Sequence, residues 1–274
     1  MKQNPIGVFD SGIGGLSVLR QLIRFMPYER YVYLGDTARV PYGNKSSETV
    51  IQYSEECTEF LLGKGVKLIV VACNTSSSVA LEAVRKHAGE IPVIGMIIPA
   101  AAAALRSSSS GKIGVIGTRA TIGSGAYNNA ILELAGEASI KVYSQVCPLF
   151  VPLVEEGMTF HPAARLIAEE YLKEVKNKGI DTLVLGCTHY PLMSQLLMEI
   201  MPGISLIDTG EHASVTALRL LADNDWLADE RHEFVIKPEI DFYITDLPSI
   251  FNELAGRFLG FAIDSPKRVS IGTH

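Results

Sequence analysis

The chain has few of the features that mark secreted, membrane-spanning or nucleic-acid-binding proteins. Four cysteines in 274 residues are too few for the disulfide framework of a small secreted domain. The longest apolar runs, such as residues 97–105, are too short to cross a bilayer, and no signal-peptide pattern follows Met1. A formal net charge of −6 argues against a phosphate backbone as the partner. We therefore expect a cytoplasmic protein that binds neither membrane nor nucleic acid.

The pattern that is present alternates short strand-like segments with longer helix-like ones. Such alternation is typical of an α/β protein with parallel sheets and right-handed crossovers. The expected strands are residues 6–9, 31–34, 68–71, 92–94, 112–116, 182–185, 205–207 and 241–245. The expected helices are residues 16–25, 48–63, 76–88, 126–135, 165–178, 191–201, 212–221 and 249–258.

One part of the pattern occurs twice. Residues 53–75 align without gaps on residues 167–189, and six of the 23 pairs are identical, including Gly65 with Gly179 and Cys73 with Cys187. Helix, glycine, strand and cysteine follow in the same order in both copies, which indicates two similar, pseudo-symmetric α/β lobes. We predict that residues 1–96 and 208–274 form the first lobe and residues 97–207 the second. The serine run with its following glycine, residues 107–111, is the best candidate for a linker inside the chain.

The repeat places Cys73 and Cys187 at the carboxyl ends of two strands, where open parallel sheets bind ligands. Each is followed by small polar residues and the start of a helix, a setting that lowers the pKa of a thiol. If the lobes face each other, the thiols do too. One thiolate could then remove a proton from a carbon acid while the opposite thiol returns one to the other face. This arrangement predicts racemisation or epimerisation by two bases.

Two further residues could assist such chemistry. Asp10 follows the first strand and His189 comes two residues after the second cysteine, so each could be an auxiliary acid or base. Either could instead be a turn former or a helix cap. Cys57 lies within an amphipathic helix pattern, and Cys147 precedes Pro148 and has no repeat partner, so we interpret both as structural.

Other functions stay open at this point. The two repeat cysteines with His189 and Asp10 could form a zinc site, although the usual two-pair spacing is missing. A non-catalytic protein that closes around an acidic metabolite is also possible. The glycines at 12–15 do not fit the dinucleotide fingerprint, and no Schiff-base lysine motif is apparent, which favours chemistry without an organic cofactor.

Five motifs carry a family resemblance. They are FDSGIGG (9–15), PYG (41–43), ACNT (72–75), IGT-x-x-T (116–121) and GCTHYP (186–191). With these motifs, in this order and spacing through about the first 210 residues, the chain resembles the glutamate racemases of the aspartate/glutamate racemase superfamily. The segment after them carries no motif that we can use.

The resemblance implies interconversion of L- and D-glutamate without a cofactor, supplying D-glutamate for peptidoglycan, and often a homodimer. A related racemase of another acidic substrate, such as aspartate, is the alternative within the class. Cys73 would deprotonate D-glutamate with help from Asp10, and Cys187 would deprotonate L-glutamate with help from His189. The residues implied to surround the substrate are Ser11, Pro41, Tyr42, Gly43, Asn74, Thr75, Thr118, Thr121 and Thr188.

Overall fold

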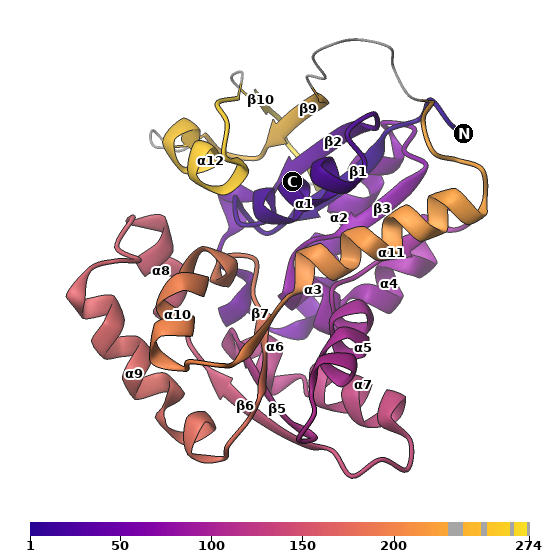
Figure 1. The fold of residues 1–274 in the computed structure, drawn as a ribbon. Coiled ribbons are helices and arrows are strands. Elements are labelled where there is room, and N and C mark those ends of the chain that lie inside the picture. Colours follow the sequence, from indigo (N-terminus) through magenta and orange to yellow (C-terminus); the bar gives the residue numbers. More distant parts are fainter. Residues whose placement is uncertain (230–237, 248–250, 264–265, 273–274) are drawn as a thin grey trace.

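The structure is a computed structural model, and it describes residues 1–229, 238–247, 251–263 and 266–272. Two parallel β-sheets with helices packed around them make up the fold, as the α/β pattern predicts (Figure 1). No helix in the described part of the chain has both the length and the apolar composition needed to cross a bilayer.

The first sheet has the strand order β10-β9-β2-β1-β3-β4, and all its pairings are parallel. Its strands are β1 (Ile6–Asp10), β2 (Arg30–Gly35), β3 (Leu68–Val71), β4 (Val93–Ile94), β9 (Glu239–Ile244) and β10 (Lys267–Arg268). Every residue of β1 and β3 is buried. Helices cover both faces of these central strands, which explains why they are short continuous apolar runs rather than alternating ones.

The second sheet has the order β6-β5-β7-β8, again with parallel pairings only. Its strands are β5 (Lys112–Gly117), β6 (Lys141–Val146), β7 (Thr182–Gly186) and β8 (Ser205–Asp208). This order matches β2-β1-β3-β4 of the first sheet, strand for strand along the chain. The pseudo-symmetry expected from the repeat is therefore present in the topology, with β3 and β7 in equivalent positions.

Helices connect and cover the strands. Around the first sheet they are α1 (Leu16–Phe25), α2 (Ser47–Leu62), α3 (Asn74–Val79), α4 (Leu81–Ala88), α11 (Thr209–Asp223) and α12 (Phe251–Leu259). Around the second they are α5 (Ile97–Ser107), α6 (Arg119–Gly123), α7 (Ala126–Ala135), α8 (Phe150–Glu155), α9 (Pro162–Asn177) and α10 (Ser194–Ile200). Three 3₁₀ helices are η1 (Thr37–Arg39), η2 (Tyr42–Asn44) and η3 (Tyr190–Met193).

Local sequence explains where these helices begin. In α9, Pro162 occupies the first helical position, where its missing N–H costs no hydrogen bond. The preceding residue, His161, accepts the N–H of Ala163 with its Nδ1 at 3.1 Å. In α2, the hydroxyl of Ser46 accepts the N–H of Thr49 at 3.3 Å. These caps satisfy N–H groups that the first helical turn leaves free.

The C-terminal part of the chain returns to the first sheet. Strand β9 pairs with β2 along its whole length, and β10 adds to β9 at the edge. Helix α11 leads back from β8 and packs against both α1 and α5, so it runs along the junction of the two halves (Figure 1). We propose lobe boundaries at 96/97 and 207/208, in keeping with this return. Part of the helix expected at 249–258 lies outside the described residues, which include α12 from Phe251 onward.

Two expectations from sequence are wrong. The single helix expected at 76–88 is two helices, because the backbone of Ala80 ends α3 before α4 begins. The serine run is not a flexible linker. It begins with Ser107, the last residue of α5, and this helix packs on β7 and β8 of the second sheet. The carboxylate of Asp181 accepts hydrogen bonds from the hydroxyl of Ser108 at 2.6 Å and from the N–H groups of Ser109 and Ser110 at 2.8 and 2.7 Å.

Candidate active site

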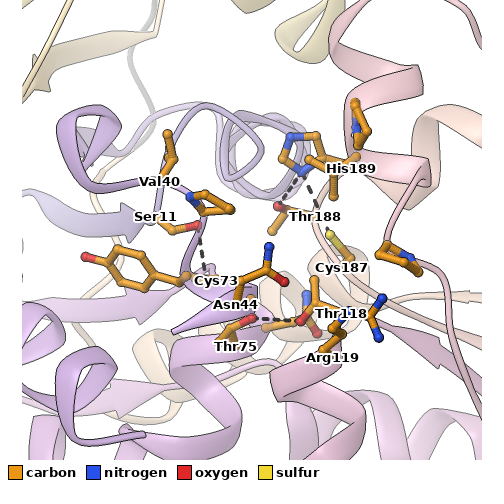
Figure 2. Close-up of a pocket in the computed structure, with 18 of the residues that line it drawn as sticks. Ser11, Val40, Asn44, Cys73, Thr75, Thr118, Arg119, Cys187, Thr188 and His189 are labelled. Carbon is orange, nitrogen blue, oxygen red and sulfur yellow. Dashed lines mark hydrogen bonds between the residues drawn. The ribbon is translucent and has the colours of Figure 1, made fainter. Parts of the chain in front are cut away.

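A cavity of about 380 Å³ lies between the carboxyl ends of the two sheets. Loops that follow β1, β2 and β3 form one wall, and loops that follow β5, β6 and β7 form the other (Figure 2). Eleven of the 13 residues predicted from sequence line it: Ser11, Pro41, Tyr42, Gly43, Cys73, Asn74, Thr75, Thr118, Cys187, Thr188 and His189. The other two, Asp10 and Thr121, are buried behind the wall.

Cys73 stands at the end of β3 and caps the N-terminus of α3. Its sulfur accepts the N–H of Ser76 at 3.5 Å, and the thiol lies 3.5 Å from the hydroxyl of Ser11. The expected lowering of its pKa is wrong. Burial and the negative charge of Asp10 raise the pKa of Cys73 to about 11, against the opposing effect of the Ser76 N–H. Burial destabilises the thiolate by more free energy than the hydrogen bonds at the helix terminus provide to stabilise it.

Cys187 follows β7 and has a different neighbour. Nδ1 of His189 lies 3.8 Å from its sulfur (Figure 2). Nε2 of the same ring lies 2.8 Å from the carboxylate of Glu155. Burial opposes a charged imidazole, but the contacts with Cys187 and Glu155 outweigh it and raise the pKa of His189 to about 10. The second thiol therefore faces an imidazolium at neutral pH.

Asp10 lies at the end of β1, below the cavity wall. One carboxylate oxygen accepts the N–H of Gly12 at 2.9 Å, and the other, Oδ1, is buried with no hydrogen-bond partner among the described residues. Burial raises the pKa of Asp10, while the positive charge of His189 acts in the opposite direction. The negative charge of Asp10 contributes to the raised pKa of Cys73, so Asp10 acts on the first thiol although it does not line the cavity.

The loop that contains Pro41, Tyr42 and Gly43 is held in place by a buried carboxylate. Asp36, which is fully buried, accepts hydrogen bonds from the hydroxyl of Tyr42, from Nε of Arg39 and from the hydroxyl of Thr245. Thr245 directly follows β9. The C-terminal part of the chain therefore fixes a loop that lines the cavity.

Three threonine hydroxyls join the two walls near the bottom of the cavity. The hydroxyl of Thr75 lies 3.1 Å from that of Thr118 and 3.2 Å from that of Thr121, which in turn lie 3.0 Å apart. Asn74 is fixed beside them, because its side-chain oxygen accepts the hydroxyl of Tyr127 at 2.6 Å. These hydroxyl and amide groups offer hydrogen bonds to a carboxylate.

The glycines after β1 permit close packing rather than phosphate binding. A Cβ added to Gly14 would collide with the hydroxyl of Thr188 and the ring of His189. A Cβ on Gly15 would likewise collide with Asp10. Only glycine lets the loop from the first sheet approach the residues after β7 this closely.

Sequence reasoning missed eight residues that line the cavity: Gly12, Val40, Asn44, Arg119, Pro148, Val151, Pro152 and Glu155. Gly12, Val40, Asn44 and Arg119 are direct neighbours of predicted residues, so proximity in the chain could have indicated them. Glu155 lies on α8 and has no repeat partner or motif around it. Cys57 and Cys147 are buried and do not line the cavity, and within the described ranges no three His, Cys, Asp or Glu side chains are grouped to hold a metal ion.

The fold and the site define a two-sheet α/β protein in which each sheet contributes a thiol to one shared cavity. The chain belongs to the Asp/Glu/Hydantoin racemase family, whose model matches residues 6–217.

Relatives support this assignment over nearly the full length. A glutamate racemase from Chlorobaculum tepidum is 49% identical over 94% of this chain and 93% of that protein. One from Syntrophus aciditrophicus is 46% identical over 98% and 97%. The crystal structure of glutamate racemase from Francisella tularensis in complex with D-glutamate has a TM-score of 0.91 at 38% identity and covers 98% of both chains.

Proposed function

We propose that this protein interconverts L- and D-glutamate with two thiols as the acid and the base. The observation that carries the proposal is the position of Cys73 and Cys187, which line one cavity from the ends of equivalent strands. The relatives named glutamate racemase support the substrate. The Francisella tularensis protein, described as a complex with D-glutamate, supports a small-molecule ligand of this kind.

In one direction, the sulfur of Cys73 takes the α-proton of D-glutamate, and the electron pair of the C–H bond stays on the α-carbon. The thiol of Cys187 then gives its proton to the opposite face, which yields L-glutamate. In the other direction, the two sulfurs exchange roles. Each turnover moves one proton to and one proton from the substrate, so no oxidant or cofactor enters the balance.

The α-proton of an amino acid is a very weak acid, so the site must stabilise the carbanion-like state more than the substrate. The hydroxyls of Thr75, Thr118 and Thr188 and the amide of Asn74 line the cavity and are held by neighbouring groups. Hydrogen-bond donors already fixed in this way stabilise charge that develops on the α-carboxylate without reorganising during the reaction.

The two thiols differ in the groups that surround them. The raised pKa of Cys73, about 11, keeps it a neutral thiol at pH 7. Cys187 instead has the imidazolium of His189 beside it, with Nδ1 at 3.8 Å from the sulfur.

The proposal extends to the cellular role. D-Glutamate made by this protein would enter peptidoglycan, in a cytoplasmic enzyme that acts as a homodimer and needs neither metal nor cofactor. Asp10 would assist Cys73, and His189 would assist Cys187. The remaining cavity residues, with Thr121 behind them, would hold the substrate carboxylates and ammonium.

Circular dichroism of L-glutamate incubated with the purified protein, with no added cofactor, tests the activity. The signal should decay to zero, and solvent deuterium should appear at the α-carbon. A protein that only binds an acidic metabolite would leave the α-carbon unlabelled. An enzyme that racemises aspartate but not glutamate would overturn the substrate assignment, and loss of activity with a chelator would favour a metal site.

A further inference from the structure

Arg119 lies at the entrance of the cavity. It is the first residue of α6, next to Thr118, and its side chain is exposed while it also lines the cavity. A side chain that does both stands at the mouth. Figure 2 shows it beside Thr118 on the wall formed by the second sheet, the wall that also carries Cys187.

In the part of the chain that the structure describes, the other charged side chains that line the cavity leave the charge of Arg119 without a counterion. Apart from the two thiols and Tyr42, the ionisable side chains that line it are Arg119, Glu155 and His189. The last two pair with each other at 2.8 Å. Within the described ranges, Arg119 has no hydrogen bond or ion pair. Among the described lining residues it is therefore the one cation that no neighbouring anion neutralises.

We propose that Arg119 is a specificity-determining residue that recruits an anionic dicarboxylate to the cavity. This inference rests on the proposed function, because glutamate carries two carboxylates and one ammonium and enters with a net negative charge. A guanidinium matches a carboxylate with two parallel N–H donors and keeps its charge at all working pH values. An amino acid with an uncharged side chain gains much less from it.

The position at the mouth predicts which kinetic parameter responds. A charge at the entrance of a low-dielectric cavity raises the local concentration and the association rate of an oppositely charged ligand. Arg119 is not among the groups that transfer protons in the proposed mechanism. Its removal should therefore weaken substrate capture and leave the chemical step nearly unchanged.

Steady-state racemisation by Arg119→Gln and Arg119→Lys tests this, with Arg106→Gln as the matched control. Arg106 is exposed on α5 and lies outside the cavity. For Arg119→Gln we expect a rise in KM of about tenfold with kcat within about twofold. The dependence of kcat/KM on salt should flatten, since screening acts on a charge that is gone. Arg119→Lys should recover part of the loss.

Calorimetric titration of glutamate into the same proteins gives a readout without turnover. Weaker binding to Arg119→Gln, with unchanged weak binding of the neutral amide glutamine, would support the inference. Kinetics and binding equal to those of Arg106→Gln would overturn it while leaving the racemase assignment intact. A wild-type protein that binds glutamate but does not racemise it would overturn the proposed function, and the binding comparison would still decide the role of Arg119.

Discussion

Cys187 and His189 form a close pair, with 3.8 Å between the sulfur and Nδ1 of the ring. The equivalent cysteine, Cys73, has no imidazole beside it among the described residues. Its sulfur instead meets the hydroxyl of Ser11 and the N–H of Ser76. The pseudo-symmetry of the two sheets therefore does not extend to the groups that contact the two thiols.

We expect each thiol to be indispensable. Cys73→Ala and Cys187→Ala should each lower racemisation by at least about a thousandfold, in the range that general acid–base groups contribute. Because the enantiomers have equal free energies in water, kcat/KM must fall equally in both directions. Deuterium exchange separates the two sites. Cys73→Ala should retain slow exchange into L-glutamate only, and Cys187→Ala into D-glutamate only.

Cys57→Ala is the control for these variants, because Cys57 is buried outside the cavity. It should racemise glutamate at close to the wild-type rate. Full activity in either Cys73→Ala or Cys187→Ala would contradict the two-thiol mechanism.

The His189–Glu155 pair predicts the alkaline limit of activity. Since the pKa of His189 is raised to about 10, the imidazolium persists through neutral pH and is lost as the pH rises through 10. We expect kcat/KM to fall above that pH. Glu155→Gln removes the carboxylate that stabilises the charged ring, so the fall should begin at lower pH. A pH–rate profile with the same alkaline limb in both proteins would argue against this role of the pair.

Gly14 should tolerate no side chain. Gly14→Ala places a Cβ against both the hydroxyl of Thr188 and the ring of His189, so both side chains or the glycine loop itself must move. We expect a loss of kcat of about a hundredfold, since misplacement by about 1 Å at a catalytic group costs this much. Gly123→Ala is the matched control, because a Cβ there meets nothing within 4 Å among the described residues. Equal activity of the two variants would show that the loop relaxes without consequence.

Asp181 should stabilise the fold through the serine run. Its hydrogen bonds with Ser108, Ser109 and Ser110 hold the pKa of this carboxyl well below its usual range, although burial acts against them. A lowered pKa means that the stabilisation is present above the ordinary value of about 4 and is lost as the pH falls below it.

Asp181→Ala should lower the free energy of unfolding by about 1–3 kcal/mol at pH 7, measured by urea denaturation. The difference from wild type should shrink at pH 3. Glu137→Ala, at an exposed position, should change stability much less. A deficit for Asp181→Ala that persists unchanged at pH 3 would show that the ionised carboxylate is not the source of the stabilisation.

Most of the strands and helices, and the positions of the two cavity cysteines, could be predicted from local patterns. The strands β3 and β7 are short apolar runs, and the repeat around them is enough to place Cys73 and Cys187 in equivalent positions. Edge strand β6 escaped prediction, because a half-exposed strand has neither a continuous apolar run nor a clear alternation. Glu155 escaped for another reason, since nothing near it in the chain indicates that it meets His189.

By itself, the sequence determined that the protein is α/β, that its halves are related, and that two cysteines end corresponding strands. These are local properties, because hydrophobic period, glycine stops and motif spacing all act over short stretches of chain. Only the tertiary structure decided which groups surround each thiol. Burial raised the pKa of Cys73 where a helix terminus alone would lower it, and α8 brought Glu155 to His189. Desolvation and charge pairing depend on which distant segments meet.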